Sequence, residues 1–122
     1  MTSRRGVIVS AIAAALVSIA LIAPAVAADP TTISVSPKEQ FSNGCNPSAS
    51  WTIGLSGGLS GQFHTTVSYG DGSSAGFYTS GTFNNNHTFF SCYTAYLRTQ
   101  YWQASRAGGG TTPYFSTKVH VN

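Results

Sequence analysis

Apolar and polar residues alternate in short runs along most of the chain after residue 30. Six such runs lie at positions 32–36, 49–55, 63–69, 77–83, 93–102 and 115–121. A repeat of two residues is typical of half-buried β-strands, whereas a helix repeats every 3.6 residues or so, and no segment after residue 30 sustains that period. Glycine- and asparagine-rich segments separate the runs, as turns do. The pattern predicts about seven antiparallel strands in a β-sandwich or small barrel.

The first 27 residues have the three parts of a secretory signal peptide. Arg4 and Arg5 give a basic start, an apolar stretch follows over 6–22, and Ala25–Ala27 places small residues before a cleavage point. The apolar stretch approaches the length of a membrane anchor, but the small-residue site and the polar chain beyond it favour cleavage. We therefore expect 28–122 to be one secreted, extracellular domain without a membrane anchor, exported by the Sec or the twin-arginine route.

Without the leader the chain is almost neutral. Its cations are Lys38, Arg98, Arg106 and Lys118 and its acids are Asp29, Glu39 and Asp71, which gives a net charge of +1. A nucleic-acid-binding protein needs a clustered basic face, so we expect no nucleic acid as a partner. The three histidines are His64, His87 and His120. Their spacing is not that of metal ligands, and we expect no metal and no other cofactor.

Cys45 and Cys92 are the two cysteines of the chain. In an oxidising compartment such a pair is expected to form a disulfide, since the spacing matches neither a Cys-x-x-Cys redox motif nor a zinc site. In the chain-entropy model a closed loop of this length stabilises a small domain by roughly 4 kcal/mol.

Four short segments carry a more specific pattern. They are Tyr69-Gly70-Asp71-Gly72-Ser73, His87-Thr88-Phe89, Cys92-Tyr93-Thr94-Ala95-Tyr96-Leu97 and Val119-His120-Val121-Asn122. Together they resemble the PKD domain, with its Gly-Asp-Gly turn, His-x-aromatic step, Tyr-led strand and closing Val-x-Val. The resemblance implies that 28–122 form a single, all-β, immunoglobulin-like antiparallel β-sandwich of about seven strands in a secreted bacterial protein.

Two positions depart from the family pattern. Val67-Ser68-Tyr69 stands where the family has Trp-x-Phe, and Cys92 stands where it has a glycine. A disulfide at Cys92 would then replace a glycine turn and tie an edge of the sandwich. In this reading Gly70, Asp71 and Gly72 form a structural turn whose carboxylate accepts backbone N–H groups. Calcium binding by Asp71 is the alternative, although no second carboxylate lies near it in the sequence.

One segment matches the sequence motif of serine hydrolases but lacks the structural context that the motif requires. Gly54-Leu55-Ser56-Gly57-Gly58 matches Gly-x-Ser-x-Gly, with Asp71 and His87 downstream. That motif needs a helix after the serine, whereas a second Gly-Leu-Ser-Gly follows here. A glycosidase needs two placed carboxylates, which three scattered acids do not offer. We therefore expect no enzyme activity and no catalytic residue.

The remaining functional candidates are aromatic. If the polar residues of 93–102 and 114–121 face solvent, then Tyr96, Trp102 and Tyr114 share one sheet surface. Such a surface suits sugar rings or a protein partner, although the rings could instead only pack against each other. The sequence thus predicts a non-catalytic module that binds extracellular polysaccharide or protein. The alternative is a small secreted effector, such as a protease inhibitor that presents the loop at 56–61 or 70–76.

Overall fold

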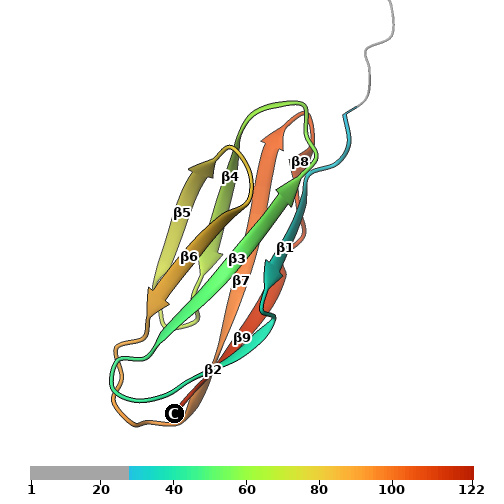
Figure 1. The fold of residues 1–122 in the computed structure, drawn as a ribbon. Helices are drawn as coiled ribbons and strands as arrows, with labels where there is room; N and C mark the ends of the chain where they lie inside the picture. Colours follow the sequence, from blue (N-terminus) through green and yellow to red (C-terminus); the bar gives the residue numbers. More distant parts are fainter. Residues whose placement is uncertain (1–27) are drawn as a thin grey trace, which may run out of the picture.

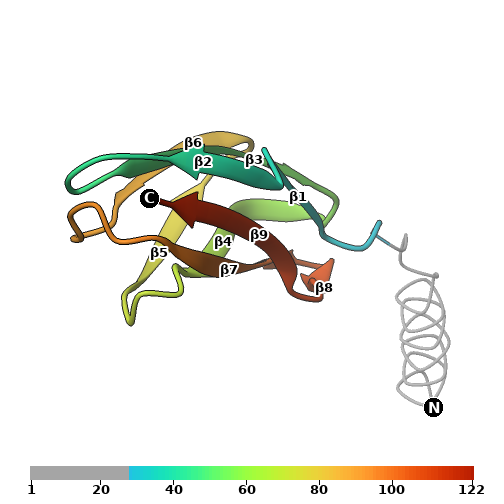
Figure 2. The same cartoon turned by 90° about the horizontal axis from the view of Figure 1, so that it is seen from below.

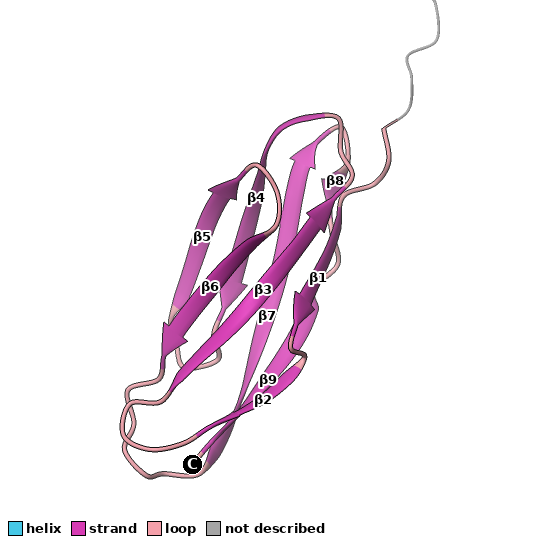
Figure 3. Ribbon diagram, in the orientation of Figure 1, coloured by secondary structure: helices cyan, strands magenta, loops and turns pink. Residues whose placement is uncertain are grey.

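Two β-sheets packed face to face make up residues 28–122, the part of the chain that the computed structural model describes (Figure 1). The predicted signal peptide lies outside the described residues. Within 28–122 the secondary structure consists of strands and loops (Figure 3), so this part contains no helix that could cross a membrane.

The smaller sheet has three strands, in the order β1-β3-β6: β1 (Thr32–Ser36), β3 (Ser48–Ser56) and β6 (Phe83–Thr88). The larger sheet has the order β2-β9-β7-β4-β5, with β8 beside β7: β2 (Glu39–Ser42), β9 (Phe115–Val121), β7 (Tyr96–Ala107), β4 (Ser60–Ser68), β5 (Ser74–Thr79) and β8 (Gly110–Thr111). Figure 2 looks along the sandwich and shows the two layers.

The predicted all-β sandwich is confirmed, and the structure adds detail that the alternation did not show. Two short strands, β2 and β8, raise the number from about seven to nine in the described part. The pair β2–β9 is parallel, whereas every other pair is antiparallel. Pro37 follows β1 directly and has no N–H for a ladder, which is consistent with the chain leaving the smaller sheet there before β2 pairs with β9 of the larger one.

Aromatic side chains from both sheets fill the space between the layers. Trp51 of β3 and Trp102 of β7 are fully buried, and their ring centroids lie 5.3 Å apart in an edge contact. Tyr69, which follows β4, meets Trp102 edge-on at 6.2 Å. Each ring of this size buries about 150–250 Å². The two tryptophans therefore supply much of the apolar contact that holds one sheet on the other.

The disulfide between Cys45 and Cys92 is formed, as predicted. Cys45 lies in the β2–β3 loop and Cys92 in the segment between β6 and β7, and both residues are exposed. Each of these connections crosses from one sheet to the other, at the lower end of the sandwich in Figure 1. The bridge ties the end of the sandwich and does not pass through its core, which agrees with the expected edge position.

Candidate functional site

The predicted aromatic surface does not exist in the form that the sequence suggested, because Trp102 points inward. Its side chain is 0% exposed. Its Nε1–H donates a hydrogen bond to Thr117 Oγ1 at 2.9 Å. Tyr96 is partly buried, with the Arg98 guanidinium 4.1 Å above its ring, whereas Tyr114 is 68% exposed. These three aromatics therefore form no common surface.

The sequence prediction assigned the wrong face of β7 to solvent. The alternation in β7 is present, but its phase is reversed, so the residues predicted outside lie inside. Gln100 is buried because its amide is fully bonded: Nε2 donates to the carbonyl oxygens of Tyr69 and Arg98 at 3.1 Å, and Oε1 accepts from Thr117 at 2.9 Å. A bonded amide can enter a core at little cost. The apolar residues predicted inside, Leu97 and Tyr101, are each 49% exposed on the outer face.

A different tyrosine surface results on the outer face of the larger sheet. Tyr101 and Tyr114 meet at 6.4 Å in an edge contact. Opposite Tyr101 lie Ser116 on β9 and Ser68 on β4, both exposed. We call Tyr101, Tyr114, Ser68 and Ser116 the tyrosine face. The sequence prediction contained Tyr114 but missed Tyr101, which only the pairing of β7 with β9 identifies as outward.

The Asp71 carboxylate closes the turn formed by Gly70, Asp71 and Gly72. Asp71 Oδ1 accepts the backbone N–H of Ser73 at 3.0 Å and also the Ser73 hydroxyl. Gly70 has φ +86°, and a Cβ at this position would lie 2.4 Å from the carbonyl oxygen of Thr99. Glycine is thus required both by the backbone conformation and by the close approach of β7.

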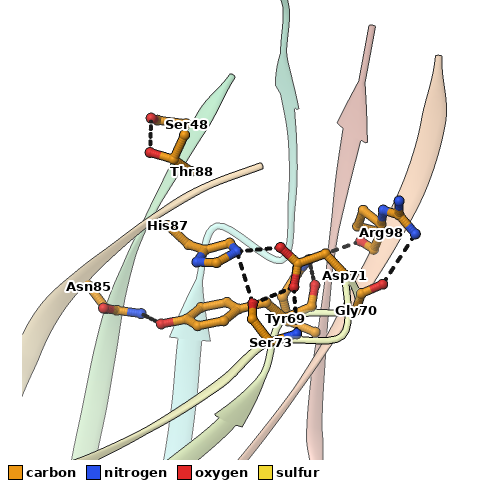
Figure 4. Close-up of polar contacts among 10 residues, drawn as sticks. Ser48, Tyr69, Gly70, Asp71, Ser73, Asn85, His87, Thr88 and Arg98 are labelled. Carbon is orange, nitrogen blue, oxygen red and sulfur yellow. Dashed lines mark hydrogen bonds and ion pairs between the residues drawn. The ribbon is translucent and has the colours of Figure 1, made fainter. Parts of the chain in front are cut away.

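His87 completes this turn from the other sheet, a contact that the sequence analysis missed (Figure 4). Its Nε2 lies 2.7 Å from Asp71 Oδ2, and its ring stacks on Tyr69 at 3.8 Å. Asn85 donates to the Tyr69 hydroxyl. The only available hint was the spacing of the His-x-aromatic step, which says nothing about distance to Asp71. We call Asp71, Ser73 and His87 the turn cluster.

Two groups at this turn, the Asp71 carboxyl and the Tyr69 hydroxyl, have pKa values that depart from their usual ones. Burial raises the pKa of the Asp71 carboxyl, but the hydrogen bonds from Ser73 and His87 outweigh it and lower the pKa to about 2. Asp71 is therefore ionised at any physiological pH. Burial also raises the pKa of the Tyr69 hydroxyl above its usual value.

The turn cluster has the residue types of a serine-hydrolase triad but not the geometry. In a triad the carboxylate and the serine contact different nitrogens of the imidazole. Here one imidazole nitrogen, Nε2 of His87, contacts both groups: it lies 2.7 Å from Asp71 Oδ2 and 3.3 Å from Ser73 Oγ. The Ser73 hydroxyl donates its hydrogen bond to Asp71. Ser56 of the hydrolase-like motif bonds to Thr32 instead. The cluster therefore fits a structural link between the sheets.

The remaining histidines, His64 and His120, have contacts outside the turn cluster. Glu39 pairs with His120, and His64 stacks on Tyr78 at 4.4 Å. Across residues 28–122 no three metal-ligating side chains gather in one place.

The two segments considered as inhibitory loops are mostly parts of strands or of tight turns. Residues 54–56 belong to β3 and 60–61 to β4, and Arg106 donates to the Gly57 carbonyl at 3.0 Å. Residues 70–73 form the Asp71 turn, and β5 begins at Ser74.

Comparison with solved structures supports the fold assignment. The structure is similar to the PKD domain of an M14-like peptidase from Thermoplasmatales archaeon SCGC AB-540-F20, with a TM-score of 0.54 and 9% sequence identity over 77% of this chain and 94% of that chain. No family model matches the sequence, and no curated protein matches it. The fold is PKD-like, as the sequence resemblance implied.

Proposed function

We propose that the protein is a secreted, non-catalytic module that binds extracellular polysaccharide through the tyrosine face. The contact between Tyr101 and Tyr114 carries this proposal, because two partly exposed rings beside serine hydroxyls offer both stacking and hydrogen bonding. The strands β4, β7 and β9 contain no acidic residue, so the surface is suited to a neutral polymer.

The polar clusters support a non-catalytic role. The hydroxyl of Ser73 donates to Asp71, and the nearby Nε2 of His87 is shared with that same carboxylate. The carboxylates of Glu39 and Asp71 pair with different histidines. Neither arrangement resembles a nucleophile with its base or a pair of carboxylates across a substrate.

The test is a pull-down of the purified secreted protein on insoluble cellulose, chitin and bacterial cell wall. The double variant Tyr101→Ala/Tyr114→Ala should lose binding while its free energy of unfolding changes by less than about 1 kcal/mol, since both rings are at the surface. Tyr93→Ala is the matched control, because Tyr93 is an exposed tyrosine in the disulfide-bonded segment.

Two results would contradict the proposal. The first is equal binding by the double variant and the wild type. The second is binding only to an immobilised protein, with no retention on any of the three polymers. Protease assays run beside the pull-down would show inhibition if the inhibitor alternative were correct.

A further inference from the structure

The lower end of the sandwich contains a cleft that is separate from the tyrosine face. Its volume is about 450 Å³, and its lining includes Asp71, Ser73, His87, Phe90, Tyr96 and Arg98. The turn after β4, the end of β6, the disulfide-bonded segment and the start of β7 each contribute to it. Small-molecule sites typically have volumes of roughly 300–1,000 Å³, so the cleft can admit a ligand of that size.

The guanidinium of Arg98 is held in place at this cleft, and no acidic side chain of residues 28–122 forms an ion pair with it. It stacks over the Tyr96 ring at 4.1 Å, and Nη1 donates to the Gly70 carbonyl at 3.3 Å. Both ion pairs among residues 28–122 use histidine, so no described carboxylate pairs with Arg98. A guanidinium fixed in this way is ready to bind a carboxylate, because little side-chain entropy remains to be lost.

The one acid in the cleft does not block an anionic ligand. Asp71 is ionised, but Ser73 donates to Oδ1 and His87 lies 2.7 Å from Oδ2. Both of its carboxylate oxygens therefore already have hydrogen-bond partners within the protein. In Figure 4 the Arg98 guanidinium points away from this pair, on the far side of the turn.

A second aromatic side chain, Phe90, lines the same cleft. Its ring is 87% exposed, so a bound ligand could reach it. A cleft that offers an apolar ring, a guanidinium and hydroxyl and imidazole groups suits a sugar that carries a carboxylate. We propose that this cleft binds a uronate unit of an acidic polysaccharide, with the carboxylate on Arg98 and the sugar ring on Phe90. This site goes beyond the proposed function and does not depend on it.

The experiment is calorimetric titration of the secreted protein with trigalacturonate at low ionic strength. We expect saturable binding that weakens as salt is added. Arg98→Gln should lower the affinity about tenfold or more, since a charge-assisted contact is lost, and Phe90→Ala should lower it by a similar factor. Lys118→Gln is the matched control: it removes the same charge from the outer sheet face and should leave the affinity unchanged.

Several results of this titration would contradict the proposal. Absence of binding, or unchanged affinity in Arg98→Gln, would refute the site. Equal affinity for the methyl-esterified trimer would refute the contact between the ligand carboxylate and Arg98. Equal affinity for a hexaglutamate peptide would show that the cleft does not recognise the sugar ring. Because Phe90 is at the surface, Phe90→Ala tests the site even if Arg98→Gln is poorly folded. Tyr101→Ala/Tyr114→Ala should leave this binding intact, which separates the cleft from the tyrosine face.

Discussion

Gln100, Thr117 and Trp102 form one polar cluster of this domain, and Asp71, Ser73 and His87 form another, the turn cluster. The first, which we call the core cluster, is sealed between the sheets and contains no titratable group. The turn cluster lies at the rim and contains an ion pair. The core cluster fixes which face of β7 points inward, whereas the turn cluster links a turn of one sheet to a strand of the other. The two should therefore respond differently to mutation and to pH.

The largest effect is expected from truncating the tryptophan of the core cluster. Trp102→Ala should lower the free energy of unfolding by about 3–5 kcal/mol, because a fully buried ring between the sheets is replaced by a cavity. Tyr101→Ala, one position earlier on the outer face, should cost less than about 1 kcal/mol. Denaturant unfolding followed by circular dichroism measures both. A larger loss in Tyr101→Ala than in Trp102→Ala would show that β7 has the phase first predicted from the sequence.

Removing the disulfide should loosen the end of the molecule that holds the turn cluster. Cys45→Ser/Cys92→Ser should lower the free energy of unfolding by about 2–5 kcal/mol. Amide hydrogen exchange should increase near Phe89, which lies three residues from the bridge, more than in the middle of β7. Uniform acceleration across the whole domain would contradict this local role.

Within the core cluster, the hydroxyl of Thr117 can be tested against a matched threonine. Thr117→Val should lower the free energy of unfolding by about 1–3 kcal/mol, because it leaves the Trp102 N–H and the Gln100 amide oxygen unpaired. Thr65 is equally buried, but its hydroxyl has no hydrogen-bond partner among the described residues. Thr65→Val should therefore be neutral or stabilising. A loss at Thr65 as large as at Thr117 would mean that packing, and not hydrogen bonding, dominates.

The turn cluster should respond to acid, and the core cluster should not. In the folded protein the pKa of the Asp71 carboxyl is lowered to about 2 from its ordinary value of 3.8. The ionised carboxyl therefore adds to the free energy of unfolding above about pH 4, and this addition is lost as the pH falls toward 2. We expect it to be about 1–2 kcal/mol, a figure that already allows for partial solvent contact. Asp71→Asn should remove this part of the pH dependence, and Thr117→Val should not. Denaturant unfolding between pH 2 and 7 measures it, and unchanged pH dependence in Asp71→Asn would contradict the assignment.

The sequence by itself determined the fold class, the disulfide and the Asp71 turn. The alternation of period two and the Gly-Asp-Gly motif each act over a few neighbouring residues. The two cysteines can form a disulfide within the chain only with each other. Five of the six predicted runs, such as 49–55 and 115–121, contain or overlap a single strand of the structure, while 77–83 covers the end of β5 and the start of β6.

The tertiary structure decided the phase of β7, the parallel pairing of β2 and the partner of Asp71. Alternation gives a period but not a phase when both faces of a strand carry aromatic and polar residues, as in 96–104. Gln100 can lie inside only because Thr117, seventeen residues away, and the Tyr69 carbonyl complete its hydrogen bonds. The pairing of Asp71 with His87 likewise depends on the packing of one sheet on the other, which no local pattern encodes.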